Sequence, residues 1–273
     1  MTGYTVIGAG GFVGAHVVSH LRAAGIEPFC PVRDDPGLWD RDLGRIIYCA
    51  GLTGDYRTRP FAAVEAHVAL AARLIERARF DRIVYLSSTR LYDLLDHGIG
   101  AEDRAIPVAS HDSEHLYELS KLLGENLILH RSAGRGAVAR LSYVFGWDDG
   151  AQGFLSDLLH KARAARRLTI DSSPDFARDY IHVDDVAMIL AALAGRDESG
   201  IFNVAGGERL SNADIATIFG ACGWQVDFTG DTHGARAPDI DTSRLAALGL
   251  TPRPVGQLLR GYLTALSADG RRG

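Results

Sequence analysis

Two residues in the segment YELSK, at residues 117–121, have the types and the spacing for acid–base chemistry. Lysine is rare in this chain: Lys121 and Lys161 are the only lysines among its 29 basic residues. Residues four apart on a helix project from the same face, so Tyr117 and Lys121 are expected to lie together. A nearby ammonium favours the phenolate of a tyrosine, whose pKa is otherwise about 10. Hydride transfer at a carbinol carbon needs such a group to give or take the hydroxyl proton.

The preference for lysine at residue 121 has a physical reason. Lysine is a compact point charge that can also reach a ribose hydroxyl, whereas arginine is a broad planar fork. A third polar group is expected nearby, because the strand-like segment RIVYLSSTRLYD, residues 82–93, ends in hydroxyls. Ser88 could polarise the same substrate oxygen as Tyr117, and Ser87 and Thr89 compete for that role. Each of these hydroxyls could instead cap a helix.

A glycine-rich loop, GAGGFVG at residues 8–14, lies between the first apolar strand-like run and the first helical segment. Its spacing GxxGxxG suits a tight turn, a close approach of backbone N–H groups to a pyrophosphate, and close packing of helix on strand. The helix that follows would direct its positive N-terminal end at the phosphates. We therefore expect a dinucleotide at this loop, with cofactor contacts from Gly8, Gly11, Phe12, Val13 and Gly14. The alternative is a glycine-rich turn without a ligand.

The segment PFCPVRDD bears on which dinucleotide binds. An acidic residue after the second strand binds the ribose 2′-hydroxyl of NAD, and an arginine there accommodates the 2′-phosphate of NADP. In our alignment Val32 takes the acidic position and Arg33 follows it. This arrangement favours NADP(H) and leaves NAD(H) as the alternative. In that alternative, Arg33 is a solvated loop residue and Asp34 or Asp35 binds the ribose.

The elements that must position these residues alternate between strand and helix. We expect helices at 15–25, 61–80 and 113–130, and strands at 5–8, 28–32, 45–51, 82–88 and 136–146. Alternation of this kind predicts an α/β fold, a Rossmann-type doubly wound parallel sheet with helices on both faces. The rhythm loosens after residue 147, with helices expected near 152–165, 183–194 and 211–222 and short strands at 168–170 and 201–204.

This change predicts two parts in the chain. Residues 1–147 would form the dinucleotide-binding domain, and residues 148–273 would mainly form a small C-terminal substrate-binding cap. Segments near 178–204 would return from the cap to the sheet.

Composition excludes several classes of function. The chain has 273 residues, of which 47% are hydrophobic, and a net charge of −5. It therefore has no surplus of basic residues that would indicate nucleic-acid binding. The three scattered cysteines form no CxxC pattern, and we expect neither a disulfide framework nor a metal site. No apolar run has the length of a membrane span, so we expect no membrane partner and a cytoplasmic location.

The motifs together resemble the extended short-chain dehydrogenase/reductases, above all the NAD(P)-dependent nucleotide-sugar epimerases, dehydratases and ketoreductases. The resemblance rests on GAGGFVG, LSSTRLYD, YELSK, RLSYVFG, RDYIHVDDVA at residues 178–187, FNVAGGERLS and RAPDID followed by LGLTP. These segments occur in the family's order over nearly the whole chain.

The resemblance implies roles for particular residues. Tyr117 would be the acid/base, Lys121 its partner and a ribose ligand, and Ser88 the hydroxyl member of the triad. Ala50 and Gly51 would line the cofactor. The remaining substrate contacts would come from Thr89, Tyr143, Arg178 and Arg236, with the two arginines holding the substrate's diphosphate.

The chain also departs from the family pattern. In the family an Asn usually stands where this chain has Tyr143, so we expect the sugar site to differ. His67 replaces an asparagine that is common in the family's helix. His182 and Asp184 belong to the motif that contains Arg178, and we interpret them as structural, because a helix that starts near Val183 needs a cap.

The resemblance limits the reaction but leaves alternatives open. In the dehydratases an Asp–Glu pair follows the triad hydroxyl, and here Thr89 and Arg90 stand there, which disfavours dehydration. We expect an NADPH-dependent reductase of a 4-keto nucleotide sugar; a nucleotide-sugar C4 epimerase that retains NAD is the alternative. A reductase of a neutral ketone is a third option, against which Arg178 and Arg236 argue.

An alternative of another class is a non-catalytic NADP-binding sensor, although such proteins tend to lose the YxxxK pair. The helices at 61–79 and 113–130 could pair two subunits into a homodimer. Amphipathic helices that merely cover a sheet would show the same pattern, so the sequence leaves the oligomeric state open.

Overall fold

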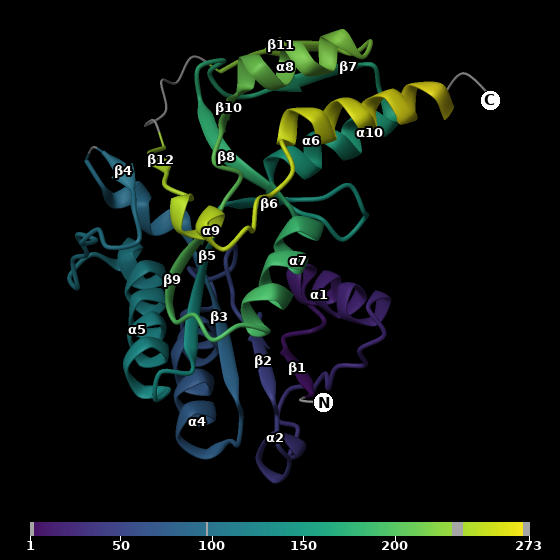
Figure 1. The fold of residues 1–273 in the computed structure, drawn as a ribbon. Helices are drawn as coiled ribbons and strands as arrows, with labels where there is room; N and C mark the ends of the chain where they lie inside the picture. The colour runs from purple at the N-terminus through teal and green to yellow at the C-terminus, as the bar shows by residue number, and fades with distance from the viewer. Residues whose placement is uncertain (1–2, 97, 231–236, 270–273) are drawn as a thin grey trace.

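A parallel sheet with the strand order β1-β2-β3-β5-β9 forms the centre of the computed structural model (Figure 1). The structure describes residues 3–96, 98–230 and 237–269. The strands are β1 (Tyr4–Ile7), β2 (Arg45–Tyr48), β3 (Arg82–Ser88), β5 (Gly136–Leu141) and β9 (Gly200–Val204). Nearly all of their residues are buried, as expected for a parallel sheet with both faces covered. The carboxyl ends of all five strands meet at one edge, because the strands are parallel.

Helices cover both faces of this sheet. On one face α1 (Phe12–Ala23) packs against α7 (Val183–Ala194), and their apolar sides enter the core that contains Val17, Leu21 and Leu190. On the other face lie α3 (Pro60–Val64), the π-helical turn η1 (Glu65–Ala69), α4 (Leu70–Arg77) and α5 (Leu116–Arg131). The short helix α2 (Gly37–Asp40) precedes β2. This arrangement confirms the predicted Rossmann-type α/β fold.

A second layer stands over the carboxyl edge of the sheet (Figure 1). It contains a three-stranded sheet in the order β10-β8-β6 and the parallel pair β11-β7. A separate core, which includes Phe145, Leu159, Trp224 and Leu259, holds this layer together. Its elements are β6 (Tyr143–Phe145), α6 (Phe154–Ala164), β7 (Arg167–Ile170), β8 (Ala177–His182), β10 (Arg209–Ser211), α8 (Asn212–Ala221), β11 (Gln225–Phe228) and α10 (Val255–Asp269).

Smaller elements connect the two layers. The 3-10 turn η2 (Thr89–Leu94) follows β3, and the 3-10 turn η3 (Ser113–His115) leads into α5. The two-residue strands β4 (Ile99–Gly100) and β12 (Asp239–Ile240) pair with each other, and α9 (Ser243–Ala247) packs near β9. Because β9 returns to the central sheet after β8 has left it, the chain crosses between the layers more than once. The domain boundary at residue 147 and the homodimer stay predictions.

Two expected strands differ from the structure. The segment 28–32 makes only an isolated bridge, in which Phe29 pairs with Thr5 of β1. Phe29 donates to Tyr4 and accepts from Val6, and the next residue whose N–H would face β1 is Pro31, which has no N–H, so the ladder cannot extend beyond Phe29 in that direction. The segment 136–146 is divided: β5 ends at Leu141 in the central sheet, and β6 begins at Tyr143 in the second layer.

Candidate active site

The glycine loop joins β1 to α1 and packs against the end of β2. Gly8 has a positive φ of 82°, and a Cβ built on it would lie 2.7 Å from the nitrogen of Ala50. A Cβ on Gly14 would clash with the carbonyl oxygen of Gly8. The N-cap residue of α1 is Gly11, so no side chain caps the first N–H groups of this helix. Uncapped N–H groups at a helix start suit a pyrophosphate, so the loop fits the cofactor that its spacing predicts.

The two residues within this motif face the protein. The ring of Phe12 meets that of His16 edge to face at 5.3 Å and lies 3.0 Å from a Cβ built on Gly146. Val13 packs against the main core. The cofactor contacts that we expect from Phe12 and Val13 are therefore confined to their backbone groups and exposed edges. Ala50 and Gly51, at the end of β2, lie beside the loop, as the packing against Gly8 requires.

The substitution Gly14→Ala is expected to lower cofactor affinity by about tenfold or more, because the added methyl forces the loop away from Gly8. It should also lower the midpoint of thermal unfolding of the cofactor-free protein. Gly10→Ala is the matched variant: nothing lies within 4 Å of its Cβ position, so its unfolding midpoint should match the wild type. Fluorescence titration and calorimetry measure the two quantities. Equal midpoints for both variants would contradict the close packing of Gly14.

Tyr117 and Lys121 lie on adjacent turns of α5, and both are buried. The side chains of Ser88 and Thr53 are polar neighbours of the Tyr117 hydroxyl. Lys121 donates to the carbonyl of Leu86 at 2.9 Å, and its Nζ is 3.3 Å from a Cβ built on Gly51. Among the three hydroxyls that the sequence left open, Ser88 is the one that neighbours the Tyr117 hydroxyl, and it also caps η2 by accepting from the N–H of Arg90. Thr89 is buried at the start of η2, and Ser87 is buried in β3.

Burial and charge act in opposite directions on these two groups. Burial raises the pKa of Tyr117. The polar side chains of Ser88 and Thr53 and the charge of the Arg90 guanidinium act to lower this pKa. Burial lowers the pKa of Lys121 to about 8, against the opposing influence of Glu125. Sequence reasoning assigned the cation that assists Tyr117 to Lys121 alone. The structure adds Arg90, whose position after Ser88 was the available signal.

A buried histidine connects this site to the loop after β2. His67 lies in the π-helical turn η1, accepts from the N–H of Leu52 through Nε2 at 3.1 Å, and bonds Ser120 through Nδ1 at 2.8 Å. Ser120 in turn donates to the carbonyl of Tyr117 at 2.9 Å. Burial lowers the pKa of His67 to about 3, and the Lys121 charge adds to the effect, so the ring is neutral at working pH. This chain of bonds holds the Gly51–Thr53 segment beside Tyr117.

Arg33 lies away from these groups. It is exposed in a turn after the Phe29 bridge, and Asp34, the next residue, has a positive φ of 62°. An exposed arginine next to the first strand is compatible with a 2′-phosphate contact, and the NADP preference stays a prediction.

Two of the expected substrate residues, Tyr143 and Arg178, lie together on the paired strands β6 and β8. The guanidinium carbon of Arg178 stacks on the rings of Tyr143 at 4.4 Å and Phe176 at 4.5 Å. The Nε of Arg178 is buried and has no hydrogen-bond partner among the described residues. Tyr143 reaches Asp93 of η2 at 3.5 Å. Arg236, the other expected diphosphate ligand, lies outside the described residues.

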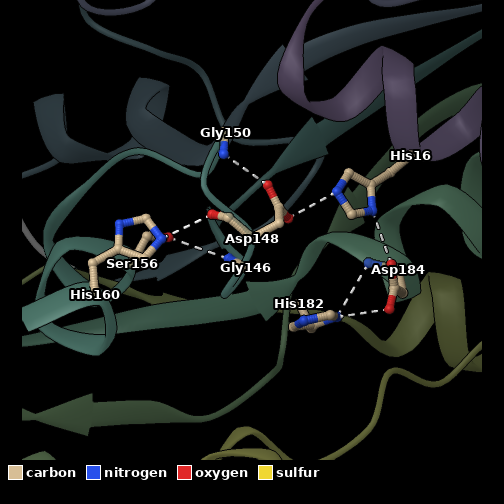
Figure 2. Close-up of polar contacts among 8 residues, drawn as sticks. All are labelled: His16, Gly146, Asp148, Gly150, Ser156, His160, His182 and Asp184. Carbon is tan, nitrogen blue, oxygen red and sulfur yellow. Dashed lines mark hydrogen bonds and ion pairs between the residues drawn. The ribbon is translucent and has the colours of Figure 1, made fainter. Parts of the chain in front are cut away.

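Figure 2 shows how the second layer is tied to the glycine loop's helix. The two nitrogens of His16 in α1 contact Asp184 at 2.9 Å and Asp148 at 3.0 Å. Asp184 is the second residue of α7, and its N–H donates to His182 at 3.2 Å. The histidine is the N-cap of α7, which confirms the structural role that we expected for His182 and Asp184. His16 therefore connects the helix at the glycine loop to both α7 and the loop after β6.

Comparisons with known proteins agree with this geometry. Residues 4–205 match the model of a family described as "NAD dependent epimerase/dehydratase family". A dTDP-4-dehydro-6-deoxy-D-allose reductase from Streptomyces bikiniensis is 24% identical in an alignment of length 256 that covers 78% of this chain and 78% of the relative. A glycerol kinase from Acidovorax sp. (strain JS42) is 25% identical in an alignment of length 265 that covers 91% of this chain. The chain spans only 51% of that kinase, so the kinase activity is not transferred to it.

Solved structures share the fold over the whole chain. The complex of MoeE5 with UDP-glucose and NAD superimposes with a TM-score of 0.76 at 24% identity, and covers 99% of both chains. RMD from Pseudomonas aeruginosa, complexed with NADPH, has a TM-score of 0.75 at 22% identity, and covers 98% of this chain and 100% of that one. In the part of the chain that the structure describes, no helix has the length and apolar character to cross a membrane.

Proposed function

This chain belongs to the NAD dependent epimerase/dehydratase family, and from that premise we propose that it reduces the keto group of a nucleoside-diphosphate sugar with NADPH. The observation that carries the proposal is that the buried Tyr117 has the Ser88 side chain as a polar neighbour, with Lys121 one helical turn away and Gly51 beside it. This group lies at the carboxyl edge of the parallel sheet, where open α/β folds bind their ligands. The similarity to a reductase that acts on a 4-dehydro sugar nucleotide supports the same conclusion.

In the proposed reaction, the chain's residues orient the ketone and supply its proton. Gly11 and Gly14 would hold the pyrophosphate of the cofactor, which would supply the hydride. Ser88 and Tyr117 hydrogen-bond the ketone oxygen, and Tyr117 donates its proton to the oxygen as the carbinol forms. Lys121 is held in place through the Leu86 carbonyl and would bind the ribose of the cofactor.

We also propose that Arg178 binds the substrate's diphosphate. A guanidinium presents a planar fork of donors that matches phosphate oxygens, and the Nε of Arg178 has no hydrogen-bond partner among the described residues. The rings of Tyr143 and Phe176 hold the guanidinium in one orientation. The pair formed by Tyr143 and Asp93 would then face the sugar. Arg236 remains the expected second diphosphate ligand.

The alternative within the same family is an epimerase that oxidises and reduces the sugar with one retained NAD. The solved relatives contain both cofactors, because MoeE5 holds NAD and RMD holds NADPH. Arg33, with no preceding acidic residue, supports NADP(H) for this chain. An exchangeable NADP(H) suits a reductase, because a reductase must replace its cofactor in every cycle.

Denaturing freshly purified protein and weighing any released nucleotide separates the two reactions. We expect little released nucleotide, with NADP as the species carried, because Arg33 favours the 2′-phosphate and a reductase exchanges its cofactor. The same preparation should oxidise NADPH when a 4-keto nucleotide sugar is added, followed at 340 nm. Near-stoichiometric NAD, together with interconversion of sugar epimers without added cofactor, would contradict the reductase and establish the epimerase. Binding of NADP without turnover of any sugar would favour a sensor.

A further inference from the structure

Arg90 contacts both Ser88 and Tyr117. It lies two residues after Ser88, at the carboxyl end of β3, and its backbone N–H donates to the Ser88 hydroxyl at 3.1 Å. Its Nε donates to Glu118 at 3.0 Å, and an Nη donates to the Tyr56 hydroxyl at 2.9 Å. These bonds hold the guanidinium in a fixed plane, because Nε and one Nη are each bonded to a different side chain.

The same guanidinium lies over the ring of Tyr117. Its central carbon is 5.0 Å from the ring centroid of Tyr117 and 5.1 Å from that of Tyr56, and the two rings are 5.4 Å apart. Both distances are in the range in which a cation and an aromatic ring attract each other. Lys121, by contrast, donates to the Leu86 carbonyl and lies over the ring of another tyrosine, Tyr85, at 5.1 Å.

We propose that Arg90 is a positioning residue for the reaction at Tyr117, and that its guanidinium over the ring favours the phenolate while its backbone N–H orients Ser88. The inference rests on the proposed acid–base role of Tyr117. It assigns to Arg90 the electrostatic task that the YxxxK spacing assigns to Lys121. Lys121 is then left to hold the ribose and the end of β3.

The surrounding charges support this role and limit its size. Burial raises the pKa of Tyr117, and Arg90 opposes that rise, whereas the Glu118 carboxylate adds to it. Glu118 is 3% exposed, and its Oε2 has no hydrogen-bond partner among the described residues, where Arg90 is its ion-pair partner. The Arg90 side chain is 30% exposed, and solvent therefore screens part of its charge. The net effect of this ion pair on the pKa of Tyr117 is the difference between the lowering by Arg90 and the raising by Glu118, after the upward shift that burial causes.

Arginine suits this position better than lysine. The guanidinium bonds Glu118 with one edge and Tyr56 with another while its face covers the rings. A lysine ammonium is a point charge and could not maintain all three contacts. Arg90→Lys should therefore restore only part of what Arg90→Gln removes.

The chain offers a matched control in Arg57. Its guanidinium also lies over the ring of Tyr56, at 5.0 Å, and also pairs with a glutamate, Glu114. The Arg57 side chain is 57% exposed, and its contacts are with Tyr56 and Glu114 and not with the ring of Tyr117. Comparing Arg90→Gln with Arg57→Gln therefore separates a charge beside Tyr117 from a charge beside its neighbour.

The experiment follows the ionisation of Tyr117 and turnover in parallel. Tyrosinate absorbance is titrated in the cofactor-bound wild type, Arg90→Gln and Arg57→Gln, each against the same protein with Tyr117→Phe added, so that the difference reports Tyr117. We expect Tyr117 to ionise at higher pH in Arg90→Gln than in the wild type, and Arg57→Gln to coincide with the wild type. The pH profile of kcat should move in the same direction, with kcat at pH 7 about tenfold lower in Arg90→Gln.

Two outcomes would overturn the inference: an unchanged Tyr117 midpoint in Arg90→Gln, or an equal displacement in Arg57→Gln. Glu118→Gln gives a second check, because removing the anion should move the midpoint to lower pH, opposite to Arg90→Gln. Displacement of both variants to higher pH would indicate damage to the local structure and would also contradict the proposal. If the midpoints separate as expected but no nucleotide sugar is turned over, the proposed function fails and the assignment of Arg90 stands.

Discussion

Tyr117→Phe is expected to lower kcat for the keto sugar by about a thousandfold and to leave cofactor affinity nearly unchanged. The substitution removes one oxygen, the one whose polar neighbours in this structure are Ser88 and Thr53. The ring would remain in its place, since it packs against Tyr56 and His67 in the interior. Binding of the dinucleotide depends mainly on the glycine loop, which Tyr117 does not contact. Steady-state kinetics and a cofactor titration on the same preparation measure the two quantities.

Tyr48→Phe is the matched control for Tyr117→Phe. Tyr48 is also fully buried, and its hydroxyl donates to the carbonyl of Ala66 on the far face of the sheet from α1. Its removal should cost about 1 kcal/mol of stability, the usual contribution of one hydrogen bond, and leave kcat unchanged. Near-wild-type turnover in Tyr117→Phe would remove Tyr117 from the chemistry. A loss of equal size in Tyr48→Phe would show that the assay reports stability.

Lys121→Arg is expected to lower kcat/KM by about a hundredfold or more, although the charge is conserved. Lys121 is 4% exposed, and its Nζ fits between the Leu86 carbonyl and the backbone at Gly51. A guanidinium is larger than this space and would displace the end of β2 or the ring of Tyr85. Burial lowers the pKa of Lys121 to about 8, so the lysine can lose part of its burial cost by releasing a proton. Arginine cannot do so, because it stays protonated in proteins.

The other lysine of the chain provides the control. Lys161 is exposed on α6, and Lys161→Arg should leave kcat/KM and the unfolding midpoint unchanged. Lys121→Arg should lower both, and kinetics together with calorimetry compare the two variants. Full activity in Lys121→Arg would mean that a conserved charge is enough at this position. It would also remove the steric account of why lysine stands in YELSK.

Local pattern alone located much of the scaffold. The apolar run at 82–88 is β3 in the structure, and the helical pattern at 183–194 is α7 with the expected cap at His182. Burial on both faces makes a central strand continuously apolar, so such runs are visible without knowing their partners. The spacing of the glycines was equally informative, because a Cβ on Gly8 would clash with Ala50 and a Cβ on Gly14 would clash with Gly8.

Prolines limit what such a pattern can show. The segment 28–32 has the apolar composition of a strand, yet only the single bridge at Phe29 forms, and Pro31 lacks the N–H that would continue it. The outcome could have been anticipated from the missing donors, since a ladder needs an N–H at alternate residues.

By itself, the sequence determined the α/β scaffold, the nucleotide loop and the pairing of Tyr117 with Lys121 on one helix face, because periods of two and 3.6 residues and the steric demands of glycine are local properties. Only the tertiary structure decided which hydroxyl meets Tyr117 and which cation covers its ring. Ser88, Thr53 and Arg90 come to Tyr117 from two other loops, and His67 from a third segment. Contacts between segments this far apart in the chain depend on how helices pack on the sheet, and no local period records them.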